Sequence, residues 1–347
     1  MRILDGHNDA LLALRRAGAG PEGFLEGGVT EHLDLPRARA GGFAGGFFAV
    51  YVPGDTALEE LVVGRPGGWE IPPIPALDPD YAHRFAEEQI ELLFAIEAAS
   101  AGAVRVVRTA AELAECVEGE VVGAILHLEG AEPLDPELRR LEPLHERGLR
   151  SIGPVWSRPN AFAEGVPFRI PSSPDTGPGL TAAGRELVRA CNRLRIVLDL
   201  SHLNERGFRE VAGLTDAPLV VTHAGAHAVS PHSRNLVDGQ LDLVRDSGGV
   251  VGVVFDVPMT SPDGSRDPAT PLDVLVRHVD HLAERMGIEH VALGSDFDGA
   301  MMPAELCDAA GLPRLLDALR AAGYGEDDLA AIAHGNWLRV LRATWGA

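Results

Sequence analysis

Imidazole and carboxylate side chains stand at or just after the ends of several apolar segments of this 347-residue chain. In chain order they are His7, Asp9, Glu129, His202, His223, Asp296 and Asp298. Each of these groups would be costly to bury without a partner. Imidazoles and carboxylates without thiolates form the ligand set of hydrolytic zinc, manganese or iron sites, and one carboxylate can bridge two ions. Because two bridged ions acidify a shared water and polarise a carbonyl, the pattern predicts a two-metal hydrolytic site.

Eight short runs rich in Val, Ile, Leu and Ala are predicted to be the strands that position these residues. The runs cover residues 2–9, 45–52, 121–130, 149–156, 195–202, 219–224, 249–255 and 290–298. Helical patterns lie between most of them, at 81–99, 136–148, 180–194, 204–214, 240–248 and 272–287. This alternation favours an α/β fold, a (β/α)₈ TIM barrel formed as one domain by residues 1–347, with the metal site at the C-terminal face of the strands.

Side chains two positions apart on a strand share one face. The pairs expected to point together into the barrel mouth are His7 with Asp9, His127 with Glu129, and Asp296 with Asp298. His127 lies deeper in the barrel, and we expect it and Asp5 to support the metal ligands from a second layer. The histidines predicted to lie in helices or loops and to face solvent are His32, His83, His145, His278, His281 and His334.

Two segments rich in Pro and Gly are too long for simple connections. They lie around residues 53–80 and 164–180, and the sequence leaves open whether they are lids over an active site or disordered decoration. Residues 103–109 form a further strand-like segment, and their alternating charges predict an exposed edge outside the barrel wall.

Composition excludes several classes of protein. The formal net charge of −21 argues against binding to nucleic acid or to an anionic membrane. Three widely spaced cysteines form no disulfide framework, and the chain shows no leader, so we expect a cytoplasmic protein. A glycine fingerprint after the first strand, a P-loop and a GxSxG elbow are all absent from the sequence. The sequence leaves open whether the protein forms a homodimer.

The segments "DGHNDAL", "HLEGAEPL", "LDLSHLNERGF", "VVTHAGAH", "SRNLVD", "HVALGSDFDG" and "GNWLRVL" occur in this order. With them the chain resembles the membrane (renal) dipeptidase family of zinc peptidases, within the amidohydrolase-like barrels. The resemblance implies a dipeptidase with two zinc ions, tolerant of a D-residue at the C-terminal position of its dipeptide substrate. His7 and Asp9 would bind one ion, His202 and His223 the other, and Glu129 would bridge them. The resemblance also assigns proton transfer to Asp296 and binding of the substrate carboxylate to Arg234.

One position departs from the family pattern. Well-known members carry a histidine after the fourth strand that polarises the scissile carbonyl, and our alignment places Trp156 there. An indole donates one hydrogen bond but carries no positive charge. Trp156 and Asn160 are therefore candidate substrate-binding residues, with Arg158 as another donor. The alternatives are hydrolysis of an N-acyl amino acid, a lactone or a cyclic amide, or an inactive metal-binding homologue.

Overall fold

The computed structural model describes residues 1–346, and its main feature is a set of parallel strands at the eight predicted positions. The strands are β1 (Ile3–Asn8), β2 (Phe43–Tyr51), β6 (Val122–Glu129), β7 (Leu149–Ile152), β9 (Val197–Leu198), β10 (Val220–Ala224), β11 (Val250–Val253) and β12 (Val291–Leu293). They form two sheets, in the orders β1-β2-β6-β7-β9 and β10-β11-β12. Isolated parallel bridges from Asp199 to Val220 and from Asn8 to Phe297 join the edges of these sheets. The predicted α/β barrel is confirmed.

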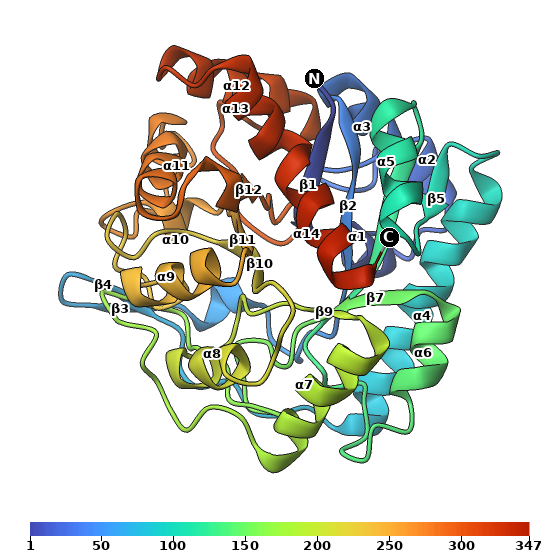
Figure 1. The fold of residues 1–347 in the computed structure, drawn as a ribbon, viewed down its shortest axis with the longest axis vertical. Helices are drawn as coiled ribbons and strands as arrows, with labels where there is room; N and C mark the ends of the chain where they lie inside the picture. Colours follow the sequence, from blue (N-terminus) through green and yellow to red (C-terminus); the bar gives the residue numbers. More distant parts are fainter. Residues whose placement is uncertain (347) are drawn as a thin grey trace.

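Helices surround the strands (Figure 1). They are α1 (Ala10–Arg16), α2 (Glu22–Leu25), α3 (Leu35–Gly41), α4 (Pro79–Ala99), α5 (Ala110–Glu118), α6 (Leu141–Arg147), α7 (Ala182–Leu194), α8 (Glu205–Ala212), α9 (Asp238–Asp246), α10 (Val257–Thr260), α11 (Asp273–Met286), α12 (Leu312–Ala321), α13 (Glu326–Ala330) and α14 (Asn336–Trp345). The six predicted helices correspond to α4, α6, α7, α8, α9 and α11. Because helices cover the outer face and side chains fill the inner one, all nine residues of β2 are buried.

An apolar plug closes the barrel at the end opposite to the polar residues. Inward side chains such as Leu4, Phe47 and Ile125 belong to one buried cluster with Trp337 of α14. The indole N–H of Trp337 donates a hydrogen bond to the carbonyl oxygen of Leu293, 3.0 Å away.

Three glycines let β10 approach its neighbours closely. A Cβ atom at Gly6, Gly252 or Gly294 would overlap the carbonyl oxygen of Thr222. Since only glycine lacks a Cβ atom, these positions have room for the Thr222 backbone. They thereby fix the position of His223, the next residue along β10.

The two long loops together form a small antiparallel sheet. Its strands are β3 (Val63–Arg65), β4 (Gly68–Glu70) and β8 (Arg169–Ile170), in that order. Within it, Trp69 donates its indole N–H to the carbonyl oxygen of Gly264, 2.9 Å away. The first loop is therefore tied to both the second loop and the segment after α10.

The prediction for the extra strand is confirmed for its place at an edge outside the barrel wall and wrong for its exposure. β5 (Val104–Val106) pairs with the beginning of β6 and lies off the main strand order, but its two valine side chains are buried. Helices α4 and α5 flank this strand in the sequence, and Val104 and Val106 join the buried clusters of the protein. Within β5 itself only Arg105 is partly exposed, so β5 is an edge strand whose apolar side chains are covered.

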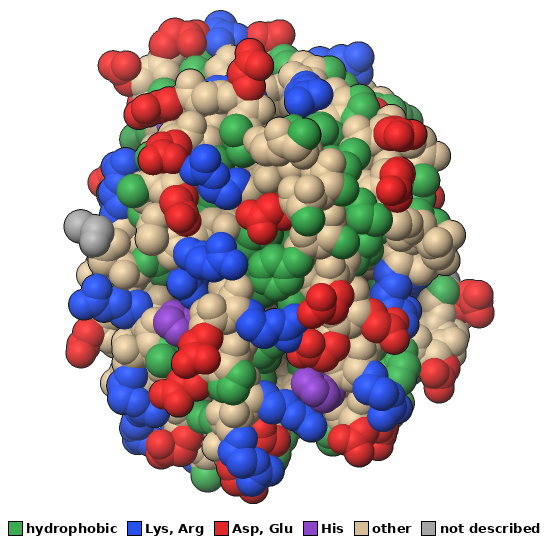
Figure 2. Space-filling view, turned by 90° about the vertical axis from the view of Figure 1, so that its right-hand side faces the viewer, with side chains coloured by type: hydrophobic (Ala, Val, Ile, Leu, Met, Phe, Trp, Pro, Cys, Tyr) green, Lys and Arg blue, Asp and Glu red, His purple; other side chains and the backbone are tan. Residues whose placement is uncertain are grey.

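Charge is mixed on the side of the molecule that carries α4 and α6. Figure 2 shows basic and acidic side chains interspersed over this face. Arg147 of α6, for example, pairs with Glu87 and Glu91 of α4 at 2.6 and 2.5 Å. Among the helices of residues 1–346, none is both long and apolar enough to cross a membrane.

Candidate active site

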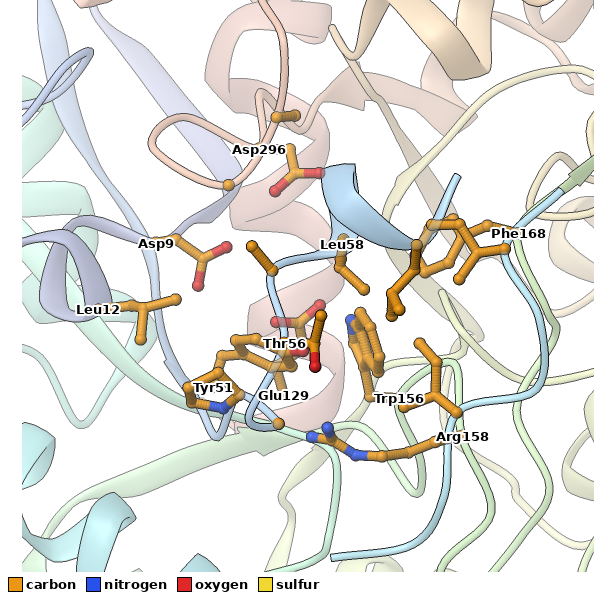
Figure 3. A pocket seen from close by; sticks show the side chains of 18 of the residues that line it. Asp9, Leu12, Tyr51, Thr56, Leu58, Glu129, Trp156, Arg158, Phe168 and Asp296 are labelled. Carbon is orange, nitrogen blue, oxygen red and sulfur yellow. The ribbon is translucent and has the colours of Figure 1, made fainter. Parts of the chain in front are cut away.

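A cavity of about 1220 Å³ opens where the barrel strands end. The first long loop supplies much of its lining through residues 53–58 and 71–78, and Phe168 comes from the second loop. Figure 3 shows Asp9, Asp296 and Glu129 pointing into this space from different elements, with Trp156 beside them. Both long loops therefore border the site that the sequence placed at the mouth.

Glu129, the last residue of β6, lies at the centre of the polar cluster. Its Oε2 atom is 3.5 Å from His7 Nε2, whereas its Oε1 atom is 2.9 Å from His202 Nε2 and 3.7 Å from His223 Nε2. The two Nε2 atoms of His202 and His223 are 3.1 Å apart, and His7 Nε2 is 3.9 Å from Asp9 Oδ2. One carboxylate oxygen thus faces each half of the cluster.

Local backbone geometry brings these side chains together. The pairing of β1 with β2 shifts register between Asp5 and Asn8, which sets His7 apart from the regular alternation of the strand. Asp9 comes directly after the last residue of β1 and directly before the first residue of α1. His223 lies within β10, and His202 lies four residues beyond the end of β9. The structure therefore gathers all five predicted ligands, although only part of the arrangement comes from strand alternation.

The unused polar atoms of this cluster fit metal ions. Both ring nitrogens of His7 and the Oδ1 atom of Asp9 are buried without a hydrogen-bond partner within residues 1–346. His202 Nδ1 contacts Ser157 Oγ at 2.8 Å, and His223 Nδ1 contacts Thr222 Oγ1 at 2.9 Å, so both Nε2 atoms stay directed at Glu129. Because buried polar atoms normally have partners, this donor set suits divalent cations.

Asp296 and Asp298 do not form the expected parallel pair. Both have positive φ, +62° and +66°, because the chain turns after β12 ends at Leu293. Asp298 accepts hydrogen bonds from the backbone N–H groups of residues 31, 32 and 33, at 2.9, 2.7 and 3.1 Å, and so anchors the segment before α3. Both side chains line the cavity, and there burial, reinforced by Glu129 and opposed by His7, raises the pKa of Asp296 to about 6.

Arg234 lies within the cavity wall and is only 3% exposed. Its guanidinium donates hydrogen bonds to the carbonyl oxygens of Ser201 and His223, at 3.0 and 3.2 Å, and its Nη2 atom is 3.3 Å from His202 Nε2. Burial lowers the pKa of Arg234 to about 10. Two backbone carbonyls therefore hold a positive charge directly beside the polar cluster.

Trp156 also borders the cluster, with its ring centroid 5.5 Å from that of His202. The guanidinium of Arg158 lies 4.9 Å from the indole ring, and Arg158 pairs with the buried carboxylate of Glu132 at 3.0 Å. Asn160 lies outside the cavity lining. Its amide donates to the carbonyl oxygen of Pro154 and accepts from two backbone N–H groups, and its side chain does not line the cavity.

One residue assigned to the second layer differs from expectation, and one buried carboxylate was missed. Asp5 accepts hydrogen bonds from the N–H and hydroxyl of Ser295, at 2.6 and 2.9 Å, and thus holds the turn before Asp296 without a bond to a histidine ring. The sequence argument missed Asp199, whose carboxylate contacts the residues around His223 and lies 3.5 Å from His127 Nε2. Its place in "LDLSH", three residues before His202, was the available signal.

The prediction that the helix and loop histidines face solvent is wrong for His278. It is fully buried, with Nδ1 accepting from the Ala226 N–H and Nε2 donating to the Thr260 carbonyl, both at 2.9 Å. His32 borders the cavity, although its side chain keeps partial exposure. Helical position alone therefore did not determine which histidines reach solvent.

Comparison with known proteins gives a family match over nearly the whole chain. Residues 1–345 match the family described as membrane dipeptidase (peptidase family M19). A Klebsiella pneumoniae protein known only as an uncharacterized protein in the pqqA 5′ region is 49% identical over 258 residues, which cover 74% of this chain and 95% of that protein.

Two solved structures share the whole fold. A metallopeptidase from Rhodobacter sphaeroides, crystallised with a phosphinate mimic of the dipeptide L-Ala-D-Ala, is 48% identical with a TM-score of 0.96, and the match covers 99% of each chain. A dipeptidase of family M19 is 49% identical with a TM-score of 0.97, covering 100% of this chain and 99% of that one.

Proposed function

The chain belongs to the membrane dipeptidase family, peptidase family M19, and on this premise we propose that it is a dipeptidase that uses two zinc ions. The observation that carries the proposal is the position of Glu129, whose two oxygens face His7 on one side and His202 with His223 on the other. His7 and Asp9 would hold one ion and the two later histidines the second. When bound, such ions supply an acidified water and a Lewis acid for the scissile carbonyl.

Asp296 is the group that we assign to proton transfer. Its carboxylate lies close to His7 and Asp9, with one possible ligand atom of each within 4.8 Å of the others. From this position it can accept a proton from the attacking water and pass it to the leaving amine. Asp298 is less suited to this role because its two oxygens already accept from three backbone N–H groups.

Arg234 would bind the free C-terminal carboxylate of the substrate. Its guanidinium is fixed by two backbone carbonyls and has a buried Nε atom without a partner in the described part of the chain. A planar guanidinium suits a carboxylate because it can donate two parallel hydrogen bonds. The L-Ala-D-Ala mimic bound by the Rhodobacter sphaeroides relative supports a D-residue at this end of the dipeptide.

Trp156 would donate its indole N–H to the oxygen of the scissile carbonyl. The other three tryptophans, Trp69, Trp337 and Trp345, each donate to a backbone carbonyl. Trp156 is only 4% exposed and lines the cavity, and its N–H is not one of the buried atoms that lack a partner within residues 1–346. An indole N–H that reaches a cavity can donate to a ligand there.

A substrate panel tests the proposed function. Purified protein loaded with zinc should release amino acids from L-Xaa-L-Xaa or L-Xaa-D-Xaa dipeptides, and a chelator should abolish the release. An N-acylated dipeptide and a lactone serve as comparison substrates, because turnover of these alone would indicate a different amidohydrolase reaction. Absence of turnover with every dipeptide would contradict the proposal.

A further inference from the structure

Asp199 lies directly after β9 and is only 3% exposed. Its Oδ1 atom accepts hydrogen bonds from the N–H of Ser201, the hydroxyl of Ser201 and the N–H of Thr222, at 3.1, 2.6 and 2.9 Å. Its Oδ2 atom accepts from the Thr222 hydroxyl at 2.7 Å. Four donors therefore converge on one buried carboxylate that is not among the five predicted ligands and does not line the cavity, although it lies near His7 and His127.

The number of hydrogens on the Thr222 hydroxyl determines which atom donates in its contact with His223. A carboxylate can only accept, and a threonine hydroxyl has a single hydrogen to donate. Thr222 donates that hydrogen to Asp199, yet its Oγ1 atom is also 2.9 Å from His223 Nδ1. The His223 nitrogen must then be the donor, so the proton of the neutral ring sits on Nδ1.

This proton position matters because His223 Nε2 points at the polar cluster. It lies 3.7 Å from Glu129 Oε1 and 3.1 Å from His202 Nε2. A metal ion binds only the unprotonated nitrogen of a neutral imidazole. With Nδ1 protonated, Nε2 has its lone pair directed at the place where the ion would lie.

We propose that Asp199 is a positioning residue that fixes the tautomer of His223 through the Thr222 hydroxyl. This proposal rests on the proposed function, because the tautomer has a role only if His223 binds a metal ion. His202 differs, because its Nδ1 atom meets only Ser157 and the structure shows no carboxylate hydrogen-bonded to that serine within residues 1–346. The protein thus enforces the tautomer more firmly at His223 than at its partner histidine.

Asp199→Asn gives the sharpest perturbation. An asparagine keeps the shape and the oxygen that accepts from Ser201, but places an N–H₂ group opposite the Thr222 hydroxyl. That hydroxyl would then accept from the amide, and its own hydrogen could turn to His223 Nδ1, 2.9 Å away, or to Ser201 Oγ, 3.0 Å away. The expected result is that the proton is no longer held on Nδ1, so the Nε2 tautomer, which blocks the metal ligand, becomes populated.

Two measurements test the proposal on the full-length chain. Nitrogen-15 NMR of histidine-labelled, metal-free protein should show His223 protonated at Nδ1 in the wild type, and should show the Nε2 tautomer populated in the Asp199→Asn variant. Competition with a chromophoric chelator should show zinc affinity lowered about 10- to 100-fold by Asp199→Asn and by Thr222→Val. Thr222→Ser, which keeps the hydroxyl, is the matched control and should stay within about twofold of wild type.

A double-mutant cycle separates positioning from a general loss of charge. If Asp199 acts through Thr222, Asp199→Asn should weaken zinc binding little further in a Thr222→Val background. If the double variant loses zinc affinity by the product of the two single losses, the proposal is overturned. A proton on Nε2 of His223 in the wild type would overturn it as well. If Asp199→Asn fails to fold, equal affinities of Thr222→Val and Thr222→Ser would still refute it. Failure of wild-type protein to bind zinc would instead count against the proposed function, because the tautomer is measured without metal.

Discussion

Replacement of His278 by glutamine should flatten the dependence of protein stability on pH below neutrality. The neutral ring of His278 is fully satisfied, because Nδ1 accepts from the Ala226 N–H and Nε2 donates to the Thr260 carbonyl. A second proton on Nδ1 would face that N–H in a site with no exposure to water. Burial accordingly lowers the pKa of His278 to about 4.

The size of the effect follows from this lowered pKa. In the unfolded chain the histidine pKa is about 6.5, so the unfolded state takes up a proton at pH values where the folded state does not. The contribution of His278 to the free energy of unfolding is fully present above pH 6.5 and falls as the pH decreases toward 4. The loss amounts to about 2 kcal/mol at pH 5 and about 3 kcal/mol in total.

Urea unfolding at pH 7.5 and pH 5, with a chelator present at both, measures this contribution. The His278→Gln variant should be less stable than wild type at pH 7.5, because at least one buried hydrogen bond is lost, at a cost of about 1–3 kcal/mol. At pH 5 the gap between the two proteins should shrink by about 2 kcal/mol. A gap of equal size at the two pH values would refute the argument that His278 stays neutral in the folded protein.

Four further substitutions address the site and the barrel. Asp296→Asn should lower kcat about 100-fold or more without changing the zinc content measured by elemental analysis, and retained turnover would exclude its role in proton transfer. Arg234→Lys should raise KM for free dipeptides about tenfold or more, because the guanidinium fork is lost; an unchanged KM would argue against carboxylate binding. Trp156→Phe keeps the ring but removes the N–H, so kcat should fall about 100-fold with little change in KM, whereas a pure KM effect would indicate a packing role. Gly252→Ala places a methyl group against the Thr222 carbonyl and should lower stability by about 1–3 kcal/mol in urea unfolding; an unchanged midpoint would show that β10 can shift.

The sequence predicted the barrel strands and the polar cluster well, for a physical reason. Strands buried on both faces appear as continuous apolar runs, so all eight positions were recognisable. Ligand-type side chains gather where those runs reach the mouth, which is why His7, Asp9 and Glu129 could be selected together. Family resemblance then supplied Arg234, whose position in a loop gave no periodic signal.

Other features depend on contacts that no local pattern encodes. The positive φ of Asp296 and Asp298 broke the expected strand alternation; both side chains line the cavity, but only Asp298 is hydrogen-bonded to the loop before α3. Asn160 is used by the backbone of its own loop, and His278 is buried because the segment after β10 packs on α11. Asp199 resembled any polar residue after a strand until its four donors were located.

The most direct test of the two-metal dipeptidase is a zinc titration of metal-free enzyme, with hydrolysis of a dipeptide such as L-Ala-D-Ala as the readout. The arrangement of ligands on both sides of Glu129 predicts that activity rises with added zinc and reaches its maximum at two equivalents per chain. Full activity at one equivalent would contradict the role of Glu129 as a bridge. No hydrolysis at any zinc loading would contradict the dipeptidase itself.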